Sequence, residues 1–95
     1  LPQIITPINN GGCSGSFSWS SIPPLSSNEF YAVLVTDAND QTIYYDLVLD
    51  RSIIINPSYF INGQKYTFML SIVYIDKNFG SFILYFNYAN FYFNG

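Results

Sequence analysis

The chain of 95 residues is 49% hydrophobic and only 9% charged, which excludes a disordered segment, and its length supports a single domain, expected over residues 1–95. Six carboxylates against three basic residues give a net charge of −3, which is the wrong sign for binding a phosphate backbone, so nucleic acid is not an expected partner. No apolar run reaches the roughly 20 residues of a membrane helix, so no transmembrane segment is expected.

Strand signals occur along the whole chain, while helix signals are missing. Alanine occurs three times, lysine twice and glutamate once, so the strong helix formers are scarce. Short segments with alternating apolar side chains are separated by turn residues, which is typical of antiparallel β-structure. The expected strands are residues 3–8, 16–20, 30–37, 42–50, 52–56, 65–75 and 81–93.

The first two expected strands have different side-chain patterns. The first is bracketed by Pro2 and Pro7, which suits a sheet edge because proline cannot donate to a ladder. Residues 9–12, Asn-Asn-Gly-Gly, have the composition of a turn. The second strand alternates strictly, with Phe17 and Trp19 on one face and serines on the other. We therefore expect this strand to be half buried, with Trp19 as a structural residue.

Three later turns are indicated by residues that tolerate a left-handed backbone or bind their own main chain. Residues 37–40 predict a hairpin between two strands, and residues 62–63 and 76–80 predict two further turns. The strand at 52–56 contains three consecutive isoleucines and ends at Pro57, so we expect it to be fully buried or to lie at a sheet edge.

Seven short strands in fewer than 100 residues predict an all-β fold, a seven-stranded antiparallel two-sheet sandwich. A resemblance to a known family supports this interpretation. It spans nearly the whole chain and rests on Pro7, Trp19, the pattern Tyr31-x-Val33-x-Val35, the segment Phe60-x-Asn62-Gly63-x-x-Tyr66 and the glycine-led last strand from Gly80 to Phe93.

On these residues the chain resembles the fibronectin type III domain, an immunoglobulin-like sandwich. The segment from Phe60 to Tyr66 is similar to the Leu-x-Pro-Gly-Thr-x-Tyr motif of that family in its spacing, with Phe60, Asn62 and Gln64 in place of Leu, Pro and Thr. The resemblance implies that Tyr66 is a structural residue that folds back and forms a hydrogen bond at this corner. The Arg-Gly-Asp adhesion tripeptide of some members is absent, so integrin binding is not implied.

Residues that could support catalysis or bind a metal are scarce, so neither an enzyme nor a cofactor is expected. The chain has no histidine, which removes the usual base of acyl transfer, and Cys13 alone cannot form a zinc, iron or copper site. Asp46 and Asp50 share a strand face but lie about 13 Å apart by the strand rise, too far for a glycosidase pair. Lys65 leaves open a spontaneous amide bond with an asparagine, as occurs in some sandwich domains. Cys13 is interpreted as a small buried thiol, with an intermolecular disulfide as the alternative.

The distinctive feature of the sequence is its surplus of apolar side chains. The strands at 30–37, 65–75 and 81–93 are apolar on both faces, and the resemblance implies that these three strands share a sheet. Their outer side chains would then form a patch larger than the roughly 300 to 600 Å² that monomers tolerate. The expected interface residues are Phe30, Leu34, Met69, Val73, Ile75, Phe82, Leu84, Tyr85, Phe86, Tyr88, Phe91, Tyr92 and Phe93.

Two hypotheses about function follow, with an ordinary monomer that has an apolar surface as the third alternative. The first is a non-enzymatic structural subunit or module that packs against copies of itself in a pilus-like or fibre-like filament, with strand addition between subunits as one route. The second is an adhesion or ligand-binding module that binds glycans or other surface proteins, with Tyr44, Tyr85 and Tyr88 as candidate stacking residues. The chain begins at Leu1, as processed chains do, so we expect an extracellular or cell-surface location.

Overall fold

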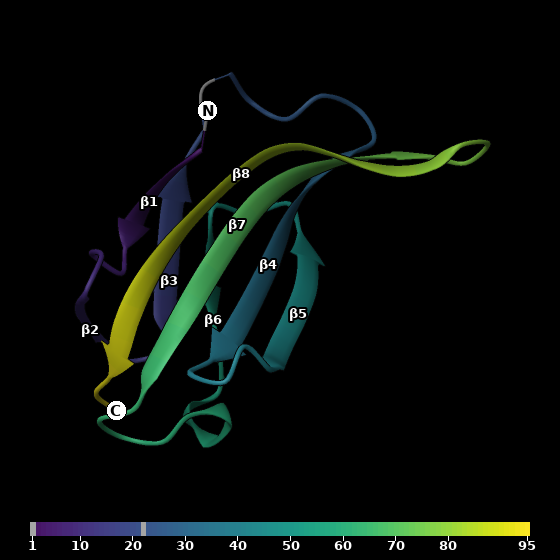
Figure 1. The fold of residues 1–95 in the computed structure, drawn as a ribbon. Helices are drawn as coiled ribbons and strands as arrows, with labels where there is room; N and C mark the ends of the chain where they lie inside the picture. The colour runs from purple at the N-terminus through teal and green to yellow at the C-terminus, as the bar shows by residue number, and fades with distance from the viewer. Residues whose placement is uncertain (1, 22) are drawn as a thin grey trace.

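The computed structural model describes residues 2–21 and 23–95, and it is built from β-strands (Figure 1). One short 3-10 helix, η1 (Pro57–Tyr59), lies just past the middle of the chain, and none of the described residues belongs to a helix long and apolar enough to cross a bilayer. The strands of the described residues are β1 (Gln3–Thr6), β2 (Gly11–Cys13), β3 (Ser16–Ser20), β4 (Glu29–Asp37), β5 (Thr42–Val48), β6 (Ser52–Ile54), β7 (Lys65–Asp76) and β8 (Gly80–Phe93).

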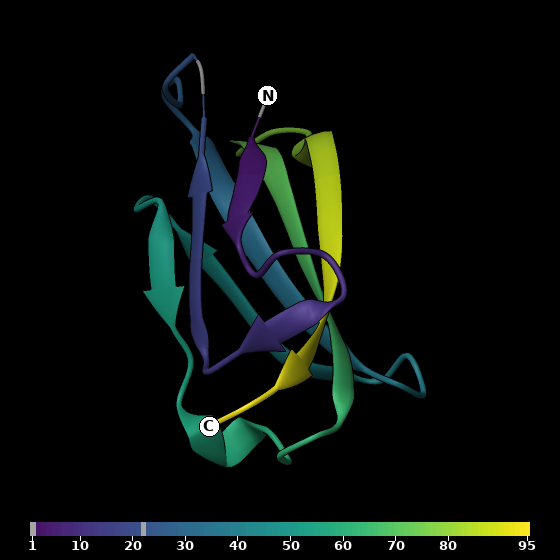
Figure 2. The same cartoon turned by 90° about the vertical axis from the view of Figure 1, so that its left-hand side faces the viewer.

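The strands form two sheets. The smaller sheet has the order β1-β3-β6 and is antiparallel, and the larger has the order β2-β8-β7-β4-β5. The larger sheet curls into a half-barrel whose long strands lie in front of the smaller sheet in Figure 1, and Figure 2 shows the two layers from the side. The three strands expected to share a sheet do so as β4, β7 and β8.

An aromatic core joins the two sheets. Phe17 of β3 stacks on Phe68 of β7 with ring centroids 4.6 Å apart, and Trp19 packs edge-on against Tyr31 of β4 at 5.5 Å. Phe91 of β8 meets Phe17 edge-on at 5.4 Å. Each such buried side chain contributes roughly 1.5 to 3 kcal/mol. The predicted burial of Phe17 and Trp19 is confirmed.

The structure has one strand more than expected, because residues 11–13 form β2 rather than part of a turn. This strand runs parallel to the end of β8, with Gly11 opposite Phe91, so the larger sheet is not entirely antiparallel. A Cβ atom on Gly12 would lie 2.6 Å from the side-chain nitrogen of Asn94, so the missing side chain allows this close approach. Two glycines have low strand propensity, which is why alternation did not reveal this strand.

The three later turns form as predicted, with side chains bound to their own main chain. The Asp37 carboxylate accepts hydrogen bonds from the backbone N–H groups of Asn39 and Gln41 at 2.9 and 3.0 Å, which closes the β4–β5 hairpin. Gly63 and Gly80 both adopt the left-handed backbone that their turns require. The isoleucine-rich strand β6 is an edge strand, and Ile54 on it is 80% exposed.

The β7–β8 hairpin extends beyond the rest of its sheet. Pairing between β4 and β7 ends at Glu29 opposite Tyr74, while β7 and β8 stay paired as far as Asp76 opposite Gly80. Figure 1 shows the hairpin projecting from the body, and we call residues 75–82 the hairpin arm. A turn at its tip is closed by the Asp76 carboxylate, which accepts hydrogen bonds from the backbone N–H groups of Asn78 and Phe79 at 2.7 and 3.0 Å.

Candidate functional site

Apolar side chains cover the face of the larger sheet that points away from the core. Because Tyr31, Val33 and Val35 of β4 lie in the core, the alternate residues of β4 point outward. Strand register then aligns three rows across the sheet. We define the outer face by ten residues of these rows, Ala32, Leu34, Tyr45, Leu47, Met69, Ser71, Val73, Ile83, Phe86 and Tyr88.

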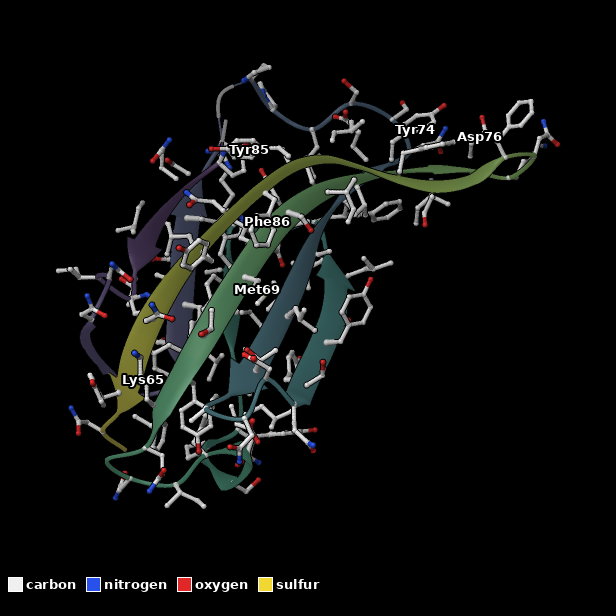
Figure 3. All side chains as sticks on the ribbon, in the orientation of Figure 1. Lys65, Met69, Tyr74, Asp76, Tyr85 and Phe86 are labelled. Atoms are coloured by element: carbon white, nitrogen blue, oxygen red, sulfur yellow. The ribbon has the colours of Figure 1, made fainter. Side chains whose placement is uncertain are left out.

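The outer face is hollowed at its centre. A hollow of about 240 Å³ lies between β5 on one side and β8 on the other, and Figure 3 labels Met69 and Phe86 in the middle of the sheet. None of the described side chains around the hollow is charged, so a ligand there would meet apolar groups, two serine hydroxyls and the Tyr45 hydroxyl. The lining residues are Ala32, Leu34, Tyr45, Met69, Ser71, Val73, Ser81, Ile83 and Phe86.

Large side chains of the outer face are exposed to an unusual degree. Ile83 is 70% exposed, and Tyr45, Phe86 and Tyr88 each expose more than half of their surface. The rings of Phe86 and Tyr88 lie 6.1 Å apart, so they form a continuous aromatic surface. Exposed apolar patches larger than a few hundred Å² are uncommon on monomeric proteins.

A β-bulge in β8 determines which of its side chains reach the outer face. Ile72 pairs with Tyr85 and Val73 pairs with Ile83, so Leu84 is an extra residue between them. A bulge re-aims the side chains beyond it. As a result Ile83 points outward, while Leu84 and Tyr85 line a different hollow of about 250 Å³ beside the loop that follows β3.

The expected interface residues fall into separate places. Leu34, Met69, Val73 and Phe86 line the central hollow, and Val73 is itself buried there. Phe30 pairs with Val73 in the same row. Tyr88 and Tyr92 are exposed on the outer side of β8, Phe82 is exposed in the hairpin arm and Leu84 at the bulge. Ile75 in the arm and Tyr85 at the bulge are half-buried.

Phe91 and Phe93 were expected at the interface, and this expectation is wrong. They are 0% and 3% exposed and belong to the core, where Phe93 stacks on Phe60 with ring centroids 4.7 Å apart. The reason is the alternation of β8 below the bulge: Phe86, Tyr88 and Tyr92 point outward, so the odd-numbered residues point inward.

Sequence reasoning missed Tyr45, Leu47, Ile83 and Phe79 as candidate interface residues. Alternation in residues 42–50 does place Tyr45 and Leu47 on one face, but it does not say which face points to the core. Pairing of Tyr45 with Leu34 and of Leu47 with Ala32 places both on the outer face. Ile83 required knowledge of the bulge, and Phe79 was interpreted only as part of a turn.

The free edges of the larger sheet are partly capped by side chains. The Asp46 carboxylate on β5 accepts a hydrogen bond from the backbone N–H of Leu47 at 2.8 Å, and the Asn87 side-chain oxygen on β8 accepts one from Tyr88 at 2.9 Å. The lower part of β8 is covered by β2. Capped donors cannot pair with an incoming strand, which makes these edges weaker sites for strand addition than a bare edge.

The three tyrosines expected to stack on sugars do not come together. Tyr85 faces the hollow at the bulge, Tyr88 lies on the outer face, and Tyr44 on β5 packs edge-on against Tyr59 with ring centroids 5.3 Å apart. Partial burial, the negative charge of Asp46 and the hydrogen bond from the Tyr44 hydroxyl to that carboxylate at 3.3 Å raise the pKa of Tyr44.

A third hollow, of about 290 Å³, lies beside Tyr59, next to the β4–β5 turn. Its lining combines the Tyr59 ring and two isoleucines with an acid, two amides and an ammonium group. This mixture of an aromatic ring with hydrogen-bonding groups differs from the uncharged outer face. Its lining residues are Asp37, Ala38, Asn39, Ile43, Tyr59, Ile61, Gln64, Lys65 and Tyr66.

Of the two remaining reactive side chains, Cys13 lines none of the three hollows, and Lys65 lines the hollow beside Tyr59. Cys13 is a free, buried thiol whose Sγ donates to the backbone oxygen of Ser16 at 3.4 Å. Burial raises the pKa of the Cys13 thiol, against the opposite effect of hydrogen bonds with the backbone of Gly15 and Ser16. Lys65 is exposed at the start of β7, so it lacks the burial that a spontaneous amide bond needs.

Tyr66 and Trp19 occupy structural positions. Trp19 is buried in the core, and its indole N–H has no hydrogen-bond partner among the described residues. The Tyr66 hydroxyl accepts a hydrogen bond from the backbone N–H of Ile61 at 2.8 Å, which is the contact implied for the corner.

No family model matches this chain, and neither a curated protein nor a solved structure matches it.

Proposed function

We propose that the chain is a non-enzymatic structural module that binds copies of itself through the outer face, as part of a filament at the cell surface. One observation carries this proposal: the outer face is a continuous apolar surface, rich in aromatic rings, whose central hollow has no charged lining. Surfaces with these properties are typical of permanent protein interfaces. Repeated contacts between identical subunits produce rings or open filaments.

We also propose that the fold is an immunoglobulin-like sandwich of the fibronectin type III kind. Two features support this assignment: the grouping of β4, β7 and β8 in one sheet opposite β1, β3 and β6, and the hydrogen bond of Tyr66 at the corner. In this assignment β2 is an addition beside the last strand. Domains of this type occur in extracellular structural proteins, which agrees with the proposed location.

The test of self-association changes exposed residues of the outer face only. In the double variant Phe86→Asp/Tyr88→Asp, two carboxylates would be desolvated on contact, so the wild-type oligomers should become monomers of 10.8 kDa. Ile54→Asp is the matched control, because Ile54 is an exposed apolar side chain on the smaller sheet. Sedimentation velocity measures all three proteins, and electron microscopy of negatively stained wild-type protein looks for filaments.

The control should assemble as the wild type does. A wild-type protein that stays monomeric up to its solubility limit would refute the proposal, as would oligomers that persist unchanged in the double variant.

A second candidate function is glycan binding at the hollow beside Tyr59. An exposed aromatic ring next to Asp37, Asn39 and Gln64 offers both stacking and hydrogen bonds to a sugar. If this hollow is the functional site, the protein binds immobilised glycans and Tyr59→Ala abolishes that binding, while Tyr88→Ala on the outer face leaves it unchanged. Absence of glycan signal from the wild-type protein removes this candidate.

A further inference from the structure

The hollow beside Tyr59 continues into a fourth hollow, of about 190 Å³, at the same end of the larger sheet. Figure 3 labels Lys65 at this end and Asp76, in the hairpin arm, at the other. Four residues line both hollows, namely Asp37, Ala38, Lys65 and Tyr66. The two hollows are therefore parts of one groove, which we call the end groove and which extends from Tyr59 beside η1 to Asn90 on β8.

The Asn90 part of the end groove presents a polar side chain in a fixed orientation. The Thr67 hydroxyl donates a hydrogen bond to the side-chain oxygen of Asn90 at 2.8 Å, which orients the amide. The backbone of Asn90 is also held, because its N–H donates to the Asn9 side chain at 2.9 Å and its oxygen accepts from the N–H of Asn10 at 2.7 Å. The amide nitrogen of Asn90 carries two further donors that a ligand in the groove can use.

The backbone on either side of the groove is fixed by hydrogen bonds of its own. In the β4–β5 turn, the N–H of Asp37 donates to the oxygen of Gln41 at 2.9 Å, and the oxygen of Asp37 accepts from Asp40 at 3.0 Å. Before β7, the backbone oxygen of Gln64 accepts from the N–H of Phe93 at 3.0 Å. The groove therefore exists before a ligand arrives, which lowers the cost of ordering its walls on binding.

We infer that the end groove binds an uncharged oligosaccharide, with one sugar stacked on Tyr59 and a further sugar of the same chain hydrogen-bonded by Asn90. This inference rests on glycan binding at the hollow beside Tyr59, the second candidate function above, and it adds the length and the charge of the glycan. An exposed aromatic ring at one end and a fixed amide at the other are the observations that carry it.

The size of the groove favours a chain over a single sugar. Most ligand sites have volumes of roughly 300 to 1,000 Å³. The hollow of about 290 Å³ beside Tyr59 lies at the lower limit of this range, and the hollow of about 190 Å³ beside Asn90 lies below it. Only a ligand that occupies both hollows reaches the size of a typical site.

The charges of the groove favour an uncharged ligand. Two carboxylates, from Asp37 and Asp40, line it together with the single ammonium group of Lys65, so an anionic ligand meets an excess of negative charge. Its other hydrogen-bonding groups are amides and hydroxyls, which both donate and accept as the hydroxyl groups of a sugar do.

The first test varies the length of the glycan. An array carries oligomers of glucose, mannose, galactose and N-acetylglucosamine with one to four units, and isothermal titration calorimetry measures the affinity for the series that binds best. The wild-type protein should bind the longest oligomer at least roughly tenfold more tightly than the single sugar, because the second part of the groove adds contacts. Equal affinity for one and four units would overturn the inference.

The second test removes the amide at the far end of the groove. Asn90→Ala keeps the backbone hydrogen bonds and should bind the single sugar as the wild type does, while the gain from a longer chain falls below about threefold. Asn78→Ala is the matched control, because it removes an exposed amide from the hairpin arm and should retain the full gain. Circular dichroism checks that both variants are folded. A full gain in Asn90→Ala would also overturn the inference.

The third test concerns charge. Oligomers oxidised to uronic acids should bind the wild-type protein roughly threefold or more weakly than the neutral oligomers of the same sugar at low salt, and Asp40→Asn should narrow this difference. Asp40 has a φ of +61°, which asparagine also adopts, so the turn is kept. Equal binding of acidic and neutral oligomers by the wild-type protein would refute the assignment of an uncharged ligand.

Failure of the inference differs from failure of the candidate function. If no oligomer binds the wild-type protein, glycan binding at Tyr59 fails and the longer groove fails with it. If single sugars bind and Tyr59→Ala abolishes that binding, but longer chains bind no more tightly, the site at Tyr59 holds and the extension to Asn90 is wrong.

Discussion

Tyr66 joins the segment after η1 to the start of β7 through a single hydrogen bond. Its ring is buried edge-on against Phe60 at 5.1 Å, and its hydroxyl accepts from the backbone N–H of Ile61. Tyr66→Phe keeps the ring and removes the acceptor, which should lower the free energy of unfolding by about 1 to 2 kcal/mol. Urea denaturation measures the change, and Tyr45→Phe, whose ring is exposed, should be neutral. Equal stability of the two variants would show that this hydrogen bond is dispensable.

At the level of single residues, the sequence predicted side chains whose role depends on local spacing. The hydrogen bond of Tyr66 was implied by the resemblance of the segment from Phe60 to Tyr66 to the fibronectin type III motif, and the burial of Trp19 follows from strict alternation with serines. Phe91 and Phe93 could not be placed in this way, because β8 is apolar in both registers. Which register faces the core depends on the pairing of β8 with β7, and that pairing is a long-range property.

Among the connections between elements, Gly15 lies at the tightest point, between β2 and β3. Its φ of +104° is left-handed, its backbone oxygen accepts from the N–H of Ile55 at 2.8 Å, and a Cβ atom there would lie 2.8 Å from the Ile55 backbone oxygen. Gly15→Ala should therefore cost clearly more than the roughly 1 kcal/mol of an unfavourable backbone conformation alone. Gly63→Ala is the control, because Gly63 has a φ of +80° and open space around it.

Thermal unfolding of both variants compares the two costs. The difference between them isolates the steric contact of Gly15 with Ile55 from the backbone strain that the two glycines share. If Gly63→Ala is as destabilising as Gly15→Ala, the junction between β2 and β3 has room to relax and the close contact carries no energy.

Strands whose own side chains alternate were predicted from the sequence. Features that depend on pairing with a distant strand were missed. The expected strands at 16–20, 30–37, 65–75 and 81–93 agree with β3, β4, β7 and β8 to within one residue at each end. β2 has no pattern of its own, because Gly11 and Gly12 pair with residues about 80 positions later in the chain. The projection of the arm is equally invisible, since it arises from where β4 stops pairing with β7.

At the scale of the whole molecule, the surplus of apolar side chains was predicted from composition, but not its distribution. Part of the surplus lies in the core, as with Phe91, and the rest divides among the outer face, the hairpin arm and scattered exposed positions such as Ile54 on the smaller sheet. Composition counts side chains without saying which surface each one reaches. The central hollow in particular depends on β5 contributing Tyr45 to the same face as β8 contributes Phe86.

The scarcity of charged side chains predicts how the assemblies respond to low pH. Protonation of all six carboxylates would change the net charge from −3 to +3, which leaves its magnitude the same, and no carboxyl group lines the central hollow. An exposed ion pair between copies would contribute only about 0 to 1 kcal/mol. Assemblies should therefore persist near pH 3, as measured by light scattering at neutral and acid pH.

High ionic strength at neutral pH is the control and should leave the assemblies equally unchanged, because salt screens the same exposed charges. Dissociation on acidification, with reassembly when the pH is raised, would show that carboxylates hold the copies together.

The side-chain caps on Leu47 and Tyr88 have a consequence for the shape of any assembly. Each side-chain oxygen accepts a hydrogen bond from a main-chain N–H at an edge of the larger sheet, so neighbouring filaments have fewer free donors through which to pair laterally. Assembly through the outer face would then lengthen a filament without lateral association. Bundles or ribbons of filaments would form only when Asp46 and Asn87 are replaced by residues that cannot accept these hydrogen bonds.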